Sequence, residues 1–154
     1  MREAVGNSLV MGMVASIIGV IMIFFVGSIS YSKAYKVKNK IINIIEENNG
    51  WDDSLNDEIN VYLKEVGYQV GAGAGNKECD ESKIKPGGKI VYCKNITNGY
   101  NYCVIRYGST DESNKDTYYK VITYMHFELP VIGSALKFPV KGETKTFGYF
   151  NGNA

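Results

Sequence analysis

The sequence predicts an α+β protein: a long N-terminal helix that crosses a membrane and continues as a stalk, a short second helix, and a small antiparallel sheet packed on the stalk. Three observations predict this fold. An uncharged apolar run extends from Ala4 to Ser32, a helical pattern continues to about Asn48, and the rest of the chain is rich in Tyr, Asn and Gly. We expect two regions, residues 1–50 with the transmembrane helix and stalk, and residues 51–154 with a small extracytoplasmic domain.

The apolar run is densest in Val, Ile, Met and Phe between Leu9 and Ile29. As a helix, this segment is long enough to cross about 30 Å of hydrocarbon. A cleaved signal peptide would have a shorter apolar region, followed by small residues at the cleavage site. The sequence therefore favours an uncleaved transmembrane helix.

Small residues recur along this helix at spacings of three and four. They are Ser8, Gly12, Ala15, Ser16 and Gly19. Small side chains on one face allow the backbone of a second membrane helix to come close, which predicts helix packing through this face. The alternative is that the face has no partner, since Gly and Ser are common in membrane helices.

The helical pattern continues beyond the apolar run as an amphipathic stalk. Its apolar stripe consists of Val37, Ile41, Ile44 and Ile45. The stretch "ENNGW" that follows supplies Asn and Gly where a left-handed helix cap is required. The whole helix would be about 60 Å long, and we expect the downstream domain to cover the stripe.

The segment "WDDSLNDEINVYLKEVG" predicts the second helix. Asp53 or Ser54 can cap its start, and Gly67 ends it. One face is apolar and consists of Leu55, Ile59, Tyr62, Leu63 and Val66. The acidic residues near its start, Asp52, Asp53, Asp57 and Glu58, fit no calcium-loop spacing, and the helix dipole explains them.

The segment "KIVYCKNITNGYNYCVIRY" predicts a β-hairpin with two possible registers. A two-residue turn at residues 98–99 would place Cys93 opposite Val104. A three-residue turn at residues 97–99 would place Cys93 opposite Cys103, where a disulfide is plausible. The second register also pairs Ile96 with Tyr100, Asn95 with Asn101, and Val91 with Ile105. Because it matches like with like, we expect this register, with Cys93 and Cys103 adjacent.

The three cysteines leave the redox state open at this point. A Cys93–Cys103 disulfide would leave Cys79 as the odd cysteine. The alternatives are a bond from Cys79 to either of the others, or three reduced thiols in a cytosolic domain. No CxxC motif is present, so we expect no metal site.

Further strands are predicted in the last third of the chain. The run "TYYKVITYMHFEL" is typical of one long strand, and "LKFPVKGETKTFGYF" predicts two strands on either side of Gly142.

Several functional classes find little support in the residues. The net charge of +1 gives no footprint for nucleic acid. His126 is the single histidine and lies in a predicted strand, and no nucleophile motif accompanies it, so we expect no catalytic residues. The alternating Gly71, Gly73 and Gly75 lack the spacing of a nucleotide-binding loop, so we expect no cofactor.

The layout resembles that of type IV pilins, and most of all the TadE-like minor pilins of tight-adherence systems. The residues that carry the resemblance are the run from Ser8 to Lys40 and the tail "YKVITYMHFELPVIGSALKFPVKGETKT". The resemblance implies a structural subunit of a surface filament or secretion-type pilus, with other pilin-like subunits as partners. The alternative is a monomeric membrane-tethered module that binds a ligand through its Tyr-rich sheet.

Two signals conflict on the orientation in the membrane. The lysines that follow the helix, Lys33, Lys36, Lys38 and Lys40, outnumber Arg2 before it, and the positive-inside rule would then place the domain in the cytoplasm. The resemblance and the cysteine pairing place the domain outside. We expect an extracytoplasmic domain, with the lysines forming the polar face of the stalk near anionic headgroups.

Overall fold

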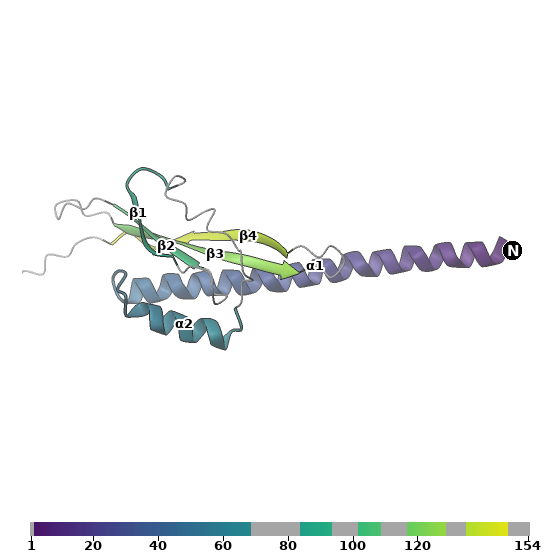
Figure 1. Ribbon diagram of the computed structural model, residues 1–154, viewed down its shortest axis with the longest axis horizontal. Helices are drawn as coiled ribbons and strands as arrows, with labels where there is room; N and C mark the ends of the chain where they lie inside the picture. The colour runs from purple at the N-terminus through teal and green to yellow at the C-terminus, as the bar shows by residue number, and fades with distance from the viewer. Residues whose placement is uncertain (1, 69–83, 94–101, 109–116, 129–134, 148–154) are drawn as a thin grey trace, which may run out of the picture.

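The computed structural model describes residues 2–68, 84–93, 102–108, 117–128 and 135–147 of the chain (Figure 1). The described elements are α1 (Arg2–Glu47), α2 (Leu55–Glu65), β1 (Gly88–Cys93), β2 (Tyr102–Tyr107), β3 (Tyr118–Glu128) and β4 (Ala135–Glu143). The strands form an antiparallel sheet in the order β1-β2-β3-β4. The sheet and α2 gather along the second half of α1, while its first half extends away from them. The predicted α+β fold is confirmed.

The second half of α1 is the centre of the hydrophobic core. The stripe of Val37, Ile41, Ile44 and Ile45 is completely covered or nearly so. Strands β3 and β4 and helix α2 pack against this part of α1. Beyond Glu47 the chain turns at Asn49, whose φ of 53° is left-handed. The predicted stalk, its coverage by the domain and its left-handed cap are therefore confirmed.

Helix α2 presents the predicted apolar face to the core, with Leu55, Ile59 and Leu63 buried. The predicted N-cap position at Ser54 is confirmed, but the capping bond from its side chain is not made. Ser54 is the N-cap residue, but its hydroxyl donates a hydrogen bond to the Asp52 carboxylate at 2.7 Å. The backbone of Ser54 is already helical, with φ −61° and ψ −28°. A capping hydroxyl needs an extended backbone to reach the first free N–H groups, which explains the difference.

The β1–β2 hairpin has the register that places Cys93 opposite Cys103. The predicted pair of Val91 with Ile105 is wrong, because the register shifts between Ile90 and Tyr92 and Ile90 lies opposite Ile105. This bulge adds one residue to β1 and turns Tyr92 toward the inner face of the sheet. The pairs predicted nearer the turn lie outside the described residues.

Within the described residues 135–147, the last predicted pair of strands is one strand. Gly142 lies within β4 opposite Val121, and no turn separates its two sides. A β-carbon built at Gly142 would come within 2.7 Å of Lys38 Cδ and 2.8 Å of Ile42 Cδ1. The glycine therefore marks a close approach of β4 to α1 and not a turn. After β4, Phe147 forms an isolated bridge with Thr117.

Candidate functional site

The first half of α1 is the part of the described chain most exposed to its surroundings. Every side chain from Gly6 to Val26 is exposed, including many Val, Ile, Met and Phe. Over Gly6–Glu47, α1 is long and apolar enough to cross a membrane, judged by length and composition. None of the residues in its most apolar stretch is buried. Such a surface is compatible with membrane anchoring, since lipid tails would cover the apolar side chains.

The small face predicted on this helix is open. Ser8, Gly12, Ala15, Ser16 and Gly19 are all exposed. Apart from the adjacent turns of the helix itself, no atom lies within 4 Å of a β-carbon built at Gly12 or at Gly19. The Ser16 hydroxyl donates a hydrogen bond to the Met13 carbonyl oxygen at 2.8 Å, so this polar group is satisfied within the helix. The role of the small face in helix packing stays a prediction.

The small face and the buried stripe lie on the same side of α1. An α-helix returns to the same direction after about 18 residues, which is five turns of 3.6 residues. Five turns separate Gly12 from Ser30 and Ser16 from Ala34. Ser30 is half-buried and Ala34 completely buried under the folded domain. The sheet therefore projects from the side of the helix on which the small residues lie.

Two contacts fix the sheet along α1. The Thr123 hydroxyl of β3 donates a hydrogen bond to the Ala34 carbonyl oxygen at 3.1 Å. At the far end of the helix, the backbone N–H of Lys145 donates to Glu46 Oε1 at 2.7 Å. Because these contacts lie 12 residues apart on α1, about 18 Å, they set both the position and the direction of the sheet.

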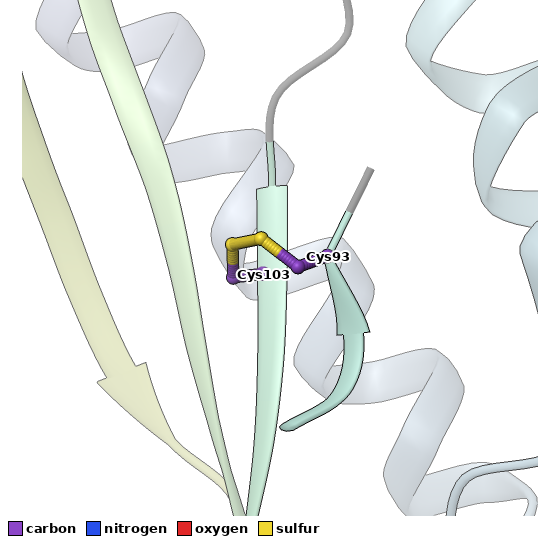
Figure 2. Close-up of a disulfide and its surroundings, with 2 residues drawn as sticks. All are labelled: Cys93 and Cys103. Carbon is purple, nitrogen blue, oxygen red and sulfur yellow. A yellow bond between two sulfur atoms is a disulfide. The ribbon is translucent and has the colours of Figure 1, made fainter. Parts of the chain in front are cut away.

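Cys93 and Cys103 form a disulfide across the hairpin (Figure 2). Their Cα atoms are 4.3 Å apart, the spacing of a pair without direct backbone hydrogen bonds. The predicted pairing is confirmed. Cys79 lies outside the described residues, as do Asn95 and the glycines Gly71, Gly73 and Gly75. Disulfides persist in oxidising compartments, so this bond bears on the location of the domain.

A row of aromatic rings connects the end of α1 to the hairpin. Trp51 stacks on Tyr92 with ring centroids 5.4 Å apart, and Tyr92 packs on Tyr102 at 5.1 Å. The Tyr102 hydroxyl donates to Asn56 Oδ1 of α2 at 3.1 Å. Burial raises the pKa of Tyr102, and the Tyr92 hydroxyl beside it raises the pKa further. The row joins β1, β2 and α2 through one cluster.

Tyr68, just after α2, supplies hydrogen bonds to the backbone of β3. Its hydroxyl donates to the Tyr124 carbonyl oxygen and accepts from the Tyr124 N–H, both at 2.8 Å. The described part of β2 begins at Tyr102, which pairs with Thr123, so Tyr124 lies one residue beyond that pairing. Burial is the main cause that raises the pKa of Tyr68. The neutral hydroxyl thus continues the hydrogen bonding of β3.

A shallow pocket of about 420 Å³ opens at the end of α1 that lies away from the apolar half. It is lined by Asn48, Asn49, Gly50, Trp51, Asp52, Arg106, Thr117, Tyr119 and Phe147. Trp51 Nε1 is buried and has no hydrogen-bond acceptor among the described residues. The pocket combines an aromatic wall, a guanidinium group and a carboxylate, which is a lining suited to a small polar ligand.

The acidic residues around the start of α2 form no cation site in the described part of the chain. Asp52, Asp53, Asp57 and Glu58 are all exposed. Among the described residues, no three side chains of His, Cys, Asp or Glu come together as metal ligands. The backbone of His126 pairs with Lys137 between β3 and β4.

The sequence analysis did not identify a cluster formed by Tyr31, Tyr35 and Lys38 at the N-terminal end of the stalk. Tyr31 and Tyr35 stack with ring centroids 6.2 Å apart, and the Lys38 ammonium lies 4.2 Å above the Tyr35 ring centroid. Their spacing of four and then three residues on one helix face was the signal that could have identified them.

A comparison of the chain with protein-family models, curated proteins and solved structures finds no match.

Proposed function

We propose that this protein is a membrane-anchored, pilin-like subunit with a structural role in a surface filament or secretion-type pilus. The first half of α1 anchors the chain, and its small face receives a neighbouring helix. The observation that carries the proposal is one unbroken helix, Arg2–Glu47, that is bare and apolar in its first half and covered by a folded domain in its second half. A subunit that is stored in a membrane and then packed into a filament needs both halves.

The position of the domain favours an assembly in which neighbouring subunits are displaced along the helix axis. Close helix packing brings the two axes within about 8 to 10 Å of each other. Two copies placed side by side with their small faces together would bring both sheets into the space between the helices at Ala34. That space is too narrow for two sheets. A neighbour displaced along the axis avoids the overlap, because its domain then lies at another height.

The proposed location of the domain is outside the cytoplasm. The disulfide between Cys93 and Cys103 supports it, since cytosolic thiols are kept reduced. Lys33 and Lys36, exposed just beyond the apolar half of α1, then face the outer headgroup layer.

The second candidate function is a monomeric module that is tethered to the membrane and binds a ligand. The pocket beside Trp51 and Arg106 favours it, because its lining begins at Asn48, directly after the end of α1 farthest from the apolar half. In this case the small face of α1 would have no partner.

The substitution Gly12→Leu in the full-length protein separates the two candidates. Leucine at this position pushes a neighbouring backbone away, so we expect filaments or oligomers purified from native membranes to be lost. The matched control is Val10→Leu, which enlarges an exposed residue on the opposite face and should leave assembly intact. Electron microscopy and cross-linking in membranes provide the readout. Assembly that survives Gly12→Leu would contradict packing through the small face, and wild-type protein that is monomeric in both measurements would contradict the subunit proposal.

A further inference from the structure

The end of the sheet that points toward the apolar half of α1 lies at a defined height on the helix. Thr123 is hydrogen-bonded to Ala34 and pairs with Val140 across the β3–β4 ladder. The next pair on the same face of the sheet, Met125 with Phe138, lies two residues or about 7 Å further along. Figure 1 shows β3 running along α1 toward its N-terminus. Because four helical residues span about 6 Å, Phe138 lies near the height of Ser30.

The apolar surface of α1 ends at this same height. Twenty residues from Val10 to Ile29 span about 30 Å as a helix, which matches the hydrocarbon thickness of a bilayer. The first charged residue after them is Lys33. A bilayer that covers the apolar half of α1 therefore has its headgroup layer beginning near Ser30, beside the end of the β3–β4 ladder.

Among the described side chains, three aromatic ones are exposed between this height and about 8 Å beyond it. Tyr31 is 53% exposed, Tyr35 45% and Phe138 50%. They lie on one flank of the molecule. The stem of Lys38 contacts the Gly142 position of β4, and its ammonium lies over Tyr35, so Tyr31 and Tyr35 are on the β4 side of α1. Phe138 precedes Gly142 by four residues and so lies on the same face of β4.

We propose that Tyr31, Tyr35 and Phe138 form an aromatic collar that docks the folded domain on the headgroup layer of an anionic bilayer. Tyrosine rings prefer the interface between hydrocarbon and water, and Phe138 places its ring at the upper limit of the hydrocarbon. The exposed Lys33 and Lys36 lie about 5 and 9 Å beyond Ser30 along α1, at the level of the headgroups, and contact lipid phosphates. The domain thus contacts the membrane surface and is not held away from it by the stalk.

The bilayer is the occupant because the collar lies directly beyond the exposed apolar surface of α1. The side chains immediately below it, from Leu9 to Ile29, are the ones that lipid would cover if α1 spans the membrane. The inference rests on the membrane anchoring in the proposed function, but it does not depend on assembly into filaments. In this proposal lipid covers Phe138, whereas in a soluble domain the same side chain would be exposed to water.

The test uses tryptophan fluorescence of the full-length protein in vesicles. Trp51 is the single tryptophan of the chain, so the double variant Trp51→Phe/Phe138→Trp carries its one indole at the collar. The vesicles contain equal parts of phosphatidylcholine and phosphatidylglycerol, with or without bromine on the acyl chains. We expect bromine to quench the emission of this variant at least twofold, and we expect that emission to be blue-shifted from its value in water.

The wild-type protein is the matched control, because Trp51 follows the end of α1 farthest from the apolar half. Its emission should not respond to brominated lipid. A second variant, Trp51→Phe/Tyr31→Trp, reports the same height from α1 alone and requires no correct folding of the sheet. Native disulfide bonding of Cys93 to Cys103, read by alkylation before reduction, verifies that the Phe138→Trp variant is folded.

The charge part of the proposal is tested by Lys33→Gln/Lys36→Gln in the Phe138→Trp background. We expect weaker quenching in vesicles that contain phosphatidylglycerol and no change in pure phosphatidylcholine. Equal quenching with and without the lysines in the anionic vesicles would overturn the choice of an anionic surface.

Other outcomes would overturn the collar itself. One is water-like, unquenched emission from the folded Phe138→Trp variant when the protein co-floats with the vesicles. Another is a blue shift that disappears on dilution of protein in the bilayer, which would assign the collar to a second copy of the chain. Protein that fails to float with the vesicles would contradict the anchor, whereas wild-type protein that is monomeric in native membranes would contradict only the filament role.

Discussion

Lys38 and Gly142 lie in contact where β4 crosses the stalk, and the glycine has no room for a side chain. A β-carbon built there would come within 2.7 Å of Lys38 Cδ. Lys38 is itself almost completely buried, and its ammonium lies over the Tyr35 ring. The lysine stem thus serves as part of the core between α1 and the sheet, while its charge stays beside an aromatic ring.

The substitution Gly142→Val should destabilise the domain. Its branched side chain would overlap both Lys38 and Ile42, and overpacking of this kind typically costs about 1 to 3 kcal/mol of unfolding free energy. Gly142→Ala should cost less, because the lysine stem is flexible and can move. Urea unfolding of the detergent-solubilised full-length protein, followed by Trp51 fluorescence, measures both changes.

The control for this series is Glu143→Ala. Glu143 follows Gly142 but points to the other face of the sheet, where its exposed carboxylate forms an ion pair at 3.4 Å with the partly buried Lys120. Loss of such a pair costs at most about 1 kcal/mol. If Gly142→Val were as mild as Glu143→Ala, the close packing of β4 on α1 would be contradicted.

Removal of the disulfide by Cys93→Ser/Cys103→Ser should lower the unfolding free energy by about 2 to 3 kcal/mol. The bond joins residues 10 apart, and cross-linking a loop of this size restricts the unfolded chain by that amount in the chain-entropy treatment. The midpoint of urea unfolding reports the change. Cys79→Ser is the control and should have little effect. Alkylation of the native protein before reduction should label neither Cys93 nor Cys103, and labelling of both would refute the bond.

The stability of the domain should fall above pH 10. Burial raises the pKa of Tyr68 and of Tyr102 in the folded protein above the ordinary value of 10.0. Below pH 10 both states keep the proton, and the full stability is present. Above it the unfolded chain loses the proton while the buried hydroxyl keeps it, so each tyrosine lowers the unfolding free energy by up to about 1.4 kcal/mol per pH unit.

The variant Tyr68→Phe separates the two effects of this hydroxyl. It should be less stable near neutral pH, because the hydrogen bonds to Tyr124 are lost, but it should have a flatter decline of stability between pH 10 and 12. Unfolding free energies measured from pH 8 to 12 provide the comparison. An unchanged slope would show that Tyr68 does not remain protonated in the folded state.

The orientation in the membrane is open to a direct labelling test. Asp53 is exposed near the start of α2, so Asp53→Cys in a Cys79→Ser background presents a reactive thiol on the folded domain. We expect a membrane-impermeant maleimide to label it on intact cells. Labelling that requires permeabilised cells would place the domain in the cytoplasm, as the four lysines after the apolar run would predict.

The helical parts of the fold could be predicted because their determinants are local. The stripe of the stalk and the apolar face of α2 repeat at the period of the helix, so Ile41 and Ile59 were identified as core residues before any packing was known. The pairing of Cys93 with Cys103 also followed from a single hairpin. The small face of α1 could be proposed from its spacing, but what it contacts is not a property of one chain.

The parts that sequence reasoning missed depend on residues far apart in the chain. Gly142 has the sequence signature of a turn, and only the presence of Lys38 across the interface shows why a glycine is required. The register shift between Ile90 and Tyr92 likewise serves an aromatic contact with Trp51, about 40 residues earlier. The alternation of apolar and polar residues within one strand carries no information about Lys38 or Trp51, the distant partners in these two contacts.

The continuity of α1 makes the anchor and the domain mechanically one body. From Ser30 to Glu47 the helix extends about 26 Å beyond the proposed membrane boundary. A tilt of about 20°, which is common for membrane helices, would move its far end sideways by about 9 Å. A change in bilayer thickness that alters this tilt would therefore change the direction in which the whole sheet points. If the first half of α1 spans the membrane as proposed, any force applied to the domain would be transmitted directly to it.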